Sequence, residues 1–548
     1  MEALYKDFCE TEFNDAGVLT SFVPKYNDDF NFSYDVIDRI AKEEPDKRAL
    51  VWCNDKGEER IFSFSELKYY SDKTANMLAD NGIKKGDMVM LVLKRHYQFW
   101  FSMLALHKLG AVAIPATHLL TEKDFVYRFN AASVKAIICT ADGEATRHVD
   151  EAQKETKDLK VKFIVNGTRD GWVSFNSELE KASSDFNRID TKADEPMLLY
   201  FTSGTTGMPK MVIHDHTYAI GHIITAVFWH NLGNDDLHLT VSETGWGKAV
   251  WGKLYGQWLA GAAVFVYDFE KFIPADLLKM IEKYKITSFC APPTIFRFFI
   301  KEGMADYDLS SLRYATTAGE ALNPEVYNKF YEFTGIKLME GFGQTETTLI
   351  ISNLANTEPK VGSMGRPSPL YNIDLVDEDG KSVAVGEIGE IVVKTTDKKQ
   401  VGLFMGYYKN DELTNSAWHD GLYHTGDTSW KDEDGYYWYV GRTDDVIKAS
   451  GYRIGPFEIE SVLMEHKAVL ECAVTGVPDP VRGQVVKATI VLTSAYKPSE
   501  ELKIELQEYV KKQTAPYKYP RIIEFVTELP KTISGKIKRV EIRKSSNS

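Results

Sequence analysis

The chain of 548 residues has few cysteines and lacks any long hydrophobic run. Its five cysteines are scattered and contain no C-x-x-C pair, which argues against a disulfide framework and against a zinc ribbon. No stretch approaches the roughly 18 apolar residues of a membrane-spanning helix, and the opening "MEALYKDFCETEFNDAG" shows no apolar signal-peptide core. We therefore expect a protein of a reducing compartment without a membrane span, by default a cytoplasmic one.

Acidic residues outnumber basic ones, and the balance differs along the chain. The formal net charge is −14, yet residues 445–548 hold 17 Lys and Arg against 13 Asp and Glu, a net +4 that leaves −18 for the rest. An acidic body without a recognition motif argues against a nucleic-acid partner. The basic C-terminal part serves solubility or faces a polyanionic small molecule, and the sequence leaves both interpretations open.

The length exceeds that of one ordinary domain and predicts a large body with at least one smaller unit. Short β-rich runs such as 88–94 and 134–140 alternate with helical runs such as 274–285, which has an apolar face. This alternation predicts an α/β body with mostly parallel sheets. Hairpin-like strands from 373 indicate a small all-β unit, and an α+β pattern follows residue 445.

The stretch "YFTSGTTGMPK", Tyr200 to Lys210, has the composition of an anion-binding loop. Glycines let backbone N–H groups approach a phosphate, while hydroxyls and the lysine add donors and charge. The spacing differs from G-x-x-x-x-G-K-[ST], because Lys210 follows Gly207 by three residues and Met211 replaces the magnesium-binding hydroxyl. The segment is therefore a phosphate loop of another design or a flexible turn, and a simple P-loop ATPase is disfavoured.

Further motifs follow the loop in a fixed order: "GFGQTET" (341–347), "YHTGD" (423–427), "GRTDDVIKASGYRIGPFEIE" (441–460) and "LPKTISGKIKR" (529–539). In this order they resemble the adenylate-forming (ANL) superfamily of acyl-CoA synthetases, firefly luciferase and peptide-synthetase adenylation domains. The stretches "SETGWGKAVWG" (242–252) and "TAGEALNPEV" (317–326) are most similar to the medium-chain and acetyl-CoA synthetase group. The resemblance covers nearly the whole chain.

The resemblance implies a fold and a reaction. An N-terminal body, residues 1–443, would contain two αβ sheet subdomains and a small β-barrel. A mobile α+β C-terminal domain, residues 444–548, would follow a hinge at Asp444. A carboxylic acid, ATP and CoA would give acyl-CoA, AMP and diphosphate through an acyl-adenylate. One orientation of the C-terminal domain would bring Lys536 to the α-phosphate, and the other would present residues 449–453 to CoA.

The resemblance also assigns roles to individual residues. Joining a carboxylate to a phosphate brings two anions together, so the site needs positive charge and donors rather than a strong base. Expected catalytic residues are Lys536, Arg442 and Glu346, with Glu346 as the Mg²⁺ ligand. Asp427 is expected at the ribose hydroxyls, Phe342 against adenine, and Ser450 and Gly451 at CoA. Residues expected to contact ATP are Thr202, Ser203, Gly204, Thr205, Thr206, Gly207, Lys210, Gly319, Glu320, Ala321, Glu340, Gly341, Phe342, Gly343, Gln344, Thr345, Asp427, Arg442, Arg453 and Lys536.

Two positions bear on which carboxylic acid the enzyme would accept. Trp246 is expected to border the acyl pocket. The similar acetyl enzymes carry a tryptophan at the position of Gly343, so its absence here predicts a cavity that extends further. Since each buried methylene contributes roughly 0.8 kcal/mol, we expect a preference for medium-length, branched or aromatic acids. An acetyl- or propionyl-CoA synthetase, an enzyme that loads a carrier-protein thiol, and a non-catalytic nucleotide-binding protein remain alternatives.

Overall fold

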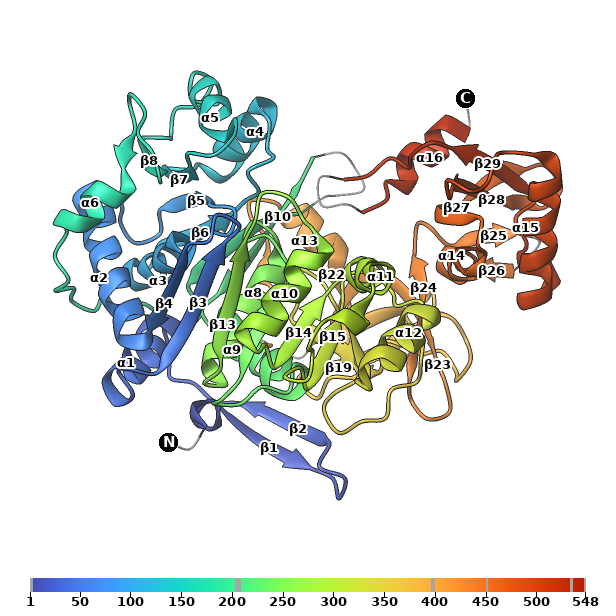
Figure 1. Cartoon of the computed structure of the whole chain (residues 1–548), viewed down its shortest axis with the longest axis horizontal. Coiled ribbons are helices and arrows are strands. Elements are labelled where there is room, and N and C mark those ends of the chain that lie inside the picture. The colour runs from blue at the N-terminus through green and yellow to red at the C-terminus, as the bar shows by residue number, and fades with distance from the viewer. Residues whose placement is uncertain (1–2, 203–207, 396–399, 450–451, 533–535, 547–548) are drawn as a thin grey trace.

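The computed structural model describes residues 3–202, 208–395, 400–449, 452–532 and 536–546. Within these residues the strands form five sheets, and Figure 1 shows the C-terminal part of the chain, in red, beside the larger body. Among the described helices, none combines the length and the apolar character that crossing a membrane requires. A small hairpin, β1 (Cys9–Phe13) and β2 (Leu19–Pro24), extends from the body at the lower edge of Figure 1.

The first large sheet is eight-stranded over the described residues, in the order β21-β11-β10-β6-β5-β7-β8-β9. It is parallel from β10 to β9, whereas β11 pairs antiparallel with both β10 and β21. Its central strands are buried along their whole length, so they appear in the sequence as continuous apolar runs. The strands are β5 (Met88–Val92), β6 (Val112–Pro115), β7 (Ala136–Thr140), β8 (Val161–Val165), β9 (Val173–Ser174), β10 (Pro196–Thr202), β11 (Lys210–Asp215) and β21 (Gly406–Tyr407).

The second large sheet contains nine strands of the described chain, in the order β18-β17-β16-β15-β14-β12-β13-β3-β4. It is parallel from β16 to β3 and antiparallel at both ends. The expected α/β body with mostly parallel sheets is therefore confirmed. The strands are β3 (Arg48–Asn54), β4 (Glu59–Ser63), β12 (Leu237–Thr240), β13 (Ala263–Asp268), β14 (Ser288–Ala291), β15 (Tyr314–Thr317), β16 (Leu338–Gly343), β17 (Leu349–Ser352) and β18 (Arg366–Pro367).

Local sequence signals explain where the helices of the body begin. Ser63 and Glu66 form a capping box before α2, and prolines occupy the first turn of α10, α11 and α12. The apolar face expected in 274–285 is buried on α10. The helices are α1 (Arg39–Glu43), α2 (Phe64–Asp80), α3 (Gln98–Leu109), α4 (Glu122–Ala132), α5 (Ala145–Gln153), α6 (Phe175–Lys181), α7 (Tyr218–Ile223), α8 (Gly247–Lys253), α9 (Tyr255–Leu259), α10 (Pro274–Tyr284), α11 (Pro293–Glu302), α12 (Pro324–Thr334) and α13 (Asp411–Ala417).

Two smaller sheets follow the body, as the change of pattern after residue 373 predicted. The first is antiparallel: β19 (Asn372–Val376), β20 (Gly389–Lys394), β22 (Trp418–His419), β23 (Leu422–Lys431) and β24 (Tyr437–Arg442). The second comprises β25 (Ile447–Ala449), β26 (Tyr452–Ile454), β27 (Val469–Asp479), β28 (Gly483–Leu492) and β29 (Ile522–Val526). The same part of the chain contains three helices, α14 (Pro456–Glu465), α15 (Glu500–Gln513) and α16 (Arg539–Ser546). We call residues 445–546 the C-terminal unit.

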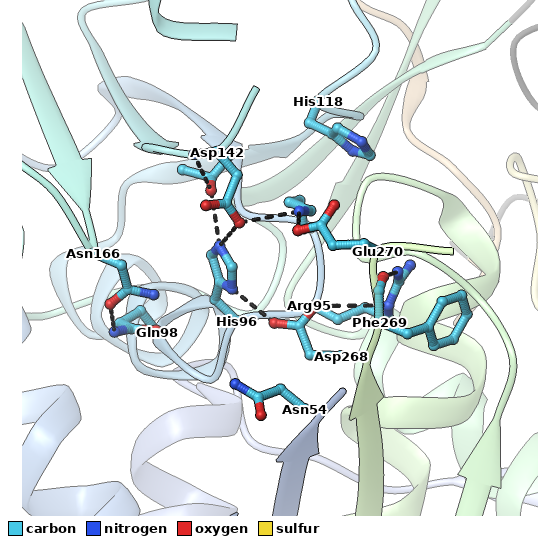
Figure 2. A network of polar contacts seen from close by, with 12 residues as sticks. Asn54, Arg95, His96, Gln98, His118, Asp142, Asn166, Asp268, Phe269 and Glu270 are labelled. Atoms are coloured by element: carbon cyan, nitrogen blue, oxygen red, sulfur yellow. Dashed lines mark hydrogen bonds and ion pairs between the residues drawn. The ribbon is translucent and has the colours of Figure 1, made fainter. Parts of the chain in front are cut away.

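A polar network, buried at Lys94, His96 and Asp268, joins the two large sheets where β5, β7 and β13 end (Figure 2). The Nδ1 atom of His96 lies 2.7 Å from Oδ2 of Asp268 on the second sheet. The ammonium of Lys94, which is also buried, donates to Asp142 at 3.0 Å and to Glu270. Because Asp268 and Glu270 follow the second sheet while their partners follow the first, the network ties the two sheets together at this edge.

Two adjacent aspartates belong to different ion networks. Asp444 lies 3.8 Å from Nε of Arg442, the last residue of β24. Asp445 instead accepts a hydrogen bond from Arg543 and lies 3.8 Å from Arg539, both on α16. The ion contact of Asp444 is therefore with the body, whereas those of Asp445 are with the C-terminal unit.

The C-terminal unit is held by a largely buried ion pair. Arg539 donates to Glu460 on α14, with Nη2 at 2.7 Å from Oε2 and Nε at 3.2 Å from Oε1. The same carboxylate accepts the backbone N–H of Val474 at 2.8 Å, and only 9% of the Glu460 side chain is exposed. Since α16 follows the "ISGKIK" segment directly, this pair fixes the base of that segment to the unit.

We predict that Glu460→Ala destabilises the C-terminal unit by about 3–5 kcal/mol, because it leaves a largely buried guanidinium without its carboxylate. Hydrogen exchange followed by mass spectrometry should show faster exchange across 445–546 and no change in β5 or β7. Glu458→Ala is the matched control, since Glu458 lies on the same helix and pairs with Lys518 at the surface, where such pairs contribute about 0–1 kcal/mol. Equal effects of the two substitutions would contradict the prediction.

Candidate active site

Asp427 and Arg442 lie side by side because β23 and β24 pair in that register. The buried Asp427 carboxylate accepts hydrogen bonds from Tyr439 (3.0 Å), from Nη1 of Arg442 (3.3 Å) and from the Gln344 amide. Burial raises the pKa of Asp427, and the charge of Arg442 opposes that rise. The result is a fixed carboxyl group bordered by a guanidinium, an arrangement able to accept from hydroxyl groups of a ligand.

Glu346 and Lys210 lie on the two sides of one tyrosine. Glu346 sits in the turn between β16 and β17, and its Oε1 accepts the hydroxyl of Tyr407 at 2.9 Å. Its backbone carbonyl accepts the N–H of Phe404 at 2.8 Å. The ammonium of Lys210, at the start of β11, lies 5.1 Å from the centre of the Tyr407 ring. Lys210 and Glu346 therefore contact the same side chain, one from β11 and the other from the turn between β16 and β17.

The segments expected around adenine lie at the carboxyl ends of two adjacent parallel strands. Thr317 of β15 pairs with Glu340 of β16, so Gly319, with φ +102°, follows one strand while Phe342 continues the other. Oε1 of Glu340 accepts the N–H of Leu322 at 3.1 Å, and its other oxygen has no hydrogen-bond partner within the described chain. Burial raises the pKa of Glu340 to about 8, so this group carries a proton at neutral pH.

Lys536 lies beside Thr532 in the C-terminal unit. Its N–H donates to the hydroxyl of Thr532 at 3.1 Å, and the side chain is exposed. Burial raises the pKa of Asp427 and lowers that of Lys248 on α8, and the positive charge of Lys536 acts to lower both. Lys536 is therefore close enough to influence two groups of the body electrostatically.

Several predicted residues do not join this cluster. Arg453 pairs with Glu378 of the small β unit, Nη2 to Oε1 at 2.7 Å, and Lys448 pairs with the same carboxylate at 3.1 Å. Glu320 is exposed and accepts the hydroxyl of Thr294 at 3.1 Å. Residues 203–207 and Ser450 and Gly451 lie outside the described residues.

Trp246 precedes α8 on a loop that is held against the first sheet. The carbonyl of Lys94 accepts both the N–H (3.2 Å) and the hydroxyl of Thr244. The carboxylate of Glu243 accepts the N–H of His118 at 3.3 Å. The half-buried Trp246 therefore depends for its position on contacts at the ends of β5 and β6.

The expectation that Gly343 borders an open cavity is wrong. A Cβ atom placed on Gly343 would lie 2.3 Å from Cη2 of Trp251 and 2.5 Å from the carbonyl oxygen of Thr348. The indole of Trp251, on α8, already fills the space that a side chain at residue 343 would need. Gly343 on β16 has no side chain, and the indole of Trp251 on α8 fills that volume instead.

The sequence motifs did not single out three residues of this region: Trp251, Tyr407 and Lys248. Lys248 donates to the carbonyl of Ala318 at 2.6 Å, next to Gly319. Tyr407 follows Gly406, whose φ of +129° is a conformation that suits glycine. The pattern "MGYYKN" contains that glycine and two aromatic residues, but nothing in it indicates contact with residues 210 and 346.

Comparisons with known proteins give the family. The model of the AMP-binding enzyme family matches residues 37–408, and that of the AMP-binding enzyme C-terminal domain matches residues 458–536. The chain belongs to the AMP-binding enzyme family. This confirms the resemblance to the adenylate-forming superfamily.

Similar proteins cover nearly the whole chain. The mitochondrial acyl-coenzyme A synthetase ACSM3 of Mus musculus is 41% identical over 99% of this chain and 96% of its own length. ACSM5 of Homo sapiens is 44% identical over 95% and 91%. An anthranilate CoA ligase solved with anthranoyl-AMP has a TM-score of 0.87 at 29% identity, covering 95% of this chain and 98% of that one. A benzoate CoA ligase of Burkholderia xenovorans LB400 has a TM-score of 0.82 at 27% identity, covering 94% and 100%.

The expected cytoplasmic location is contradicted. The relatives from mouse, rat and human are named as mitochondrial enzymes. The five free cysteines could not have distinguished the two locations, because they indicate only that the compartment is reducing.

We predict that Glu340→Gln changes how stability depends on pH. The folded pKa of about 8 lies above the ordinary 4.5, so the folded state binds the proton more tightly and wild-type stability falls as pH rises between these values. The introduced amide would mimic the protonated acid and would not titrate. The difference in the free energy of unfolding, variant minus wild type, should therefore increase by on the order of 3–5 kcal/mol between pH 5 and pH 9. Denaturant titrations at both pH values measure this difference. Glu325→Gln, at an exposed position of α12, should follow the wild-type curve, and a Glu340→Gln curve parallel to wild type would refute the assignment.

Proposed function

We propose that this enzyme activates a medium-length, branched or aromatic monocarboxylate and transfers it to CoA. It is an ATP-dependent acyl-CoA synthetase, an AMP-forming acid–thiol ligase that works through an acyl-adenylate. One arrangement supports the roles assigned to these residues. Lys210 and Glu346 both contact Tyr407, and the charge of Lys536 acts on Asp427. These groups supply what the first half-reaction needs, which is positive charge and oriented donors around phosphate.

In the adenylation step, each group acts on a different part of ATP. The loop ending at Lys210 holds the β- and γ-phosphates as the leaving diphosphate. Asp427, with Arg442, accepts from the ribose hydroxyls, and Phe342 packs against adenine near the protonated carboxyl of Glu340. Lys536 neutralises charge between the α-phosphate and the attacking carboxylate. The contacts within the Asp427 cluster support this division, because they leave a buried acceptor in a fixed place.

Mg²⁺ fits the residues present. The described chain holds no group of three or more His, Cys, Asp or Glu side chains that could hold a metal, and Glu346 is a carboxylate that shares Tyr407 with Lys210. This suits an ion that is held by one carboxylate together with phosphate oxygens. Bound Mg²⁺ would supply charge neutralisation at the phosphates, and Glu346 would orient it.

The thioester step uses the other face of the C-terminal unit. Residues 444–548 turn about Asp444 relative to residues 1–443, which is supported by the separate ion networks of Asp444 and Asp445. This rotation of the C-terminal domain moves Lys536 away from the α-phosphate and brings Ser450 and Gly451 to the acyl-adenylate. Arg453 would then exchange the carboxylate of Glu378 for a phosphate.

A small cleft on the C-terminal unit, which could border a nucleotide but not enclose one, carries aromatic and basic side chains and favours CoA over a carrier-protein thiol as the acceptor. Tyr452 and Tyr517 stack with ring centres 4.0 Å apart, and Arg521 lies over the ring of Tyr519 at 4.8 Å. Aromatic faces with guanidinium groups suit an adenine nucleotide that carries phosphates. The residues lining the cleft are Ala449, Tyr452, Arg482, Gln484, Val485, Val486, Tyr517, Tyr519 and Arg521.

The choice of acid rests on the relatives and on α8. The solved neighbours named for anthranilate and benzoate act on aromatic acids, and an acetyl- or propionyl-CoA synthetase is the second candidate. Trp246 and Trp251 border the proposed acyl pocket near Gly343. A panel from acetate to laurate with branched and aromatic acids, followed by AMP formation with and without CoA, tests the proposal. Preference for acetate alone, or AMP formation that is indifferent to CoA, would favour the alternatives.

We predict that Lys536→Ala slows adenylation by roughly 10²–10³-fold, because it removes one positive charge from the reacting phosphate. Thioester formation from supplied acyl-adenylate should survive, as pyrophosphate exchange and CoA consumption measured separately will show. Lys538→Ala is the control, since Lys538 pairs with Glu541 at the surface and should leave both steps unchanged. Equal loss in both half-reactions would contradict the two-orientation mechanism.

We predict that Trp251→Ala opens the space beside Gly343 to longer acids. The value of kcat/KM for octanoate, divided by that for butyrate, should rise at least about tenfold, which corresponds to about 1.4 kcal/mol. The reason is that the longer chain gains buried surface. Trp430→Ala removes an indole that stacks on Trp438 and should leave the ratio unchanged. A uniform loss for every acid would show that Trp251 supports the fold without bordering the acid.

A further inference from the structure

Tyr407 is firmly held between two parts of the candidate site. It lies on β21 and pairs with Val212 of β11, the strand that begins with Lys210. Its N–H donates to the hydroxyl of Thr414 at 2.9 Å, its ring contacts Phe404 with centres 5.1 Å apart, and it is only 5% exposed. A side chain fixed in this way has a defined direction before any ligand arrives.

The same side chain contacts two groups of opposite charge. Its hydroxyl donates to Oε1 of Glu346 at 2.9 Å, and its ring lies 5.1 Å from the ammonium of Lys210. The hydroxyl is the donor in this contact, because an ionised carboxylate can only accept. One residue therefore offers a donor to the carboxylate and a π face to the cation.

The backbone around Tyr407 makes the same connection. The N–H groups of Met405 and Tyr408 donate to β11 at Ile213 and Met211, both at 2.8 Å. The N–H of Phe404, one residue before Met405, donates to the carbonyl of Glu346, also at 2.8 Å. The segment 404–408 thus links the strand after the phosphate loop to the turn that carries Glu346.

A lysine and a glutamate that lie on either side of one tyrosine attract each other. A direct ion pair would occupy both groups, and ATP with its cation would have to break that pair before binding. A tyrosine between them gives each a weaker, neutral partner that phosphate and metal can replace.

We propose that Tyr407 is a positioning residue that keeps Lys210 and Glu346 apart and directs one to phosphate and the other to the metal ion. This inference rests on the roles proposed above for Lys210 and Glu346. Tyrosine is the side chain that meets both requirements, since phenylalanine lacks the donor and leucine lacks the donor and the ring.

Two substitutions at this position separate the two contacts. Tyr407→Phe removes only the hydroxyl, so Mn²⁺ binding to the ATP complex, followed by electron paramagnetic resonance, should weaken about tenfold. ATP binding without metal, measured by calorimetry, should stay within about twofold of wild type. Tyr407→Leu also removes the ring, so ATP binding should weaken at least about fivefold. Tyr34→Phe deletes a hydroxyl that donates to Lys108 far from the site and should change neither measurement.

A double-mutant cycle tests whether the ring acts through Lys210. If it does, Lys210→Gln combined with Tyr407→Leu should weaken ATP binding no more than Lys210→Gln alone. Additive losses would overturn the proposal, as would wild-type Mn²⁺ binding in Tyr407→Phe. If Tyr407→Leu fails to fold, Tyr407→Phe still decides. Wild-type protein that binds neither ATP nor Mn²⁺·ATP would overturn the roles of Lys210 and Glu346 themselves, and this inference with them.

Discussion

The pairing of Asp427 with Arg442 across β23 and β24 determines the geometry of the rest of the site. A buried carboxylate needs partners, and Asp427 obtains them from Tyr439, from Gln344 and from Arg442. Gln344 stands two residues before Glu346, so the same contact fixes the start of the turn that carries Glu346. Arg442 ends β24 and contacts Asp444, after which the chain enters the C-terminal unit. The contacts that satisfy this one buried carboxyl group therefore order Gln344 and Arg442, and Arg442 lies next to the start of the C-terminal unit.

Local patterns in the sequence predicted local structure well. Continuous apolar runs gave β5 and β7, and the apolar face of 274–285 gave α10. The motifs around residues 346, 427 and 442 also named residues that the structure brings together. Tyr407 could not be found in this way, because its contacts come from β11 and from the turn after β16, which are distant in sequence. Such a role depends on the pairing of strands across the fold, and no spacing rule within one segment encodes it.

The failure at Gly343 has a different cause. A missing side chain was interpreted as missing volume, but protein interiors are close-packed and a neighbour usually fills a vacated space. Here the neighbour is Trp251, five residues after Trp246 on the same short stretch of chain. The space beside Gly343 is therefore set by α8 and β16 together. The location of the protein was misjudged for a related reason, since free cysteines report the redox state of a compartment and not its identity.

Those cysteines have a consequence for the chemistry of the enzyme. All five are buried, and burial raises the pKa of Cys9 to about 12 and that of Cys53 to about 11. Disulfide exchange requires a thiolate that can reach its partner, and a buried thiol of high pKa provides neither the charge nor the access. The enzyme takes a free thiol, CoA, as its substrate. Oxidised CoA in the same compartment therefore meets no reactive protein sulfur, and the folded enzyme resists capture as a mixed disulfide with its own substrate.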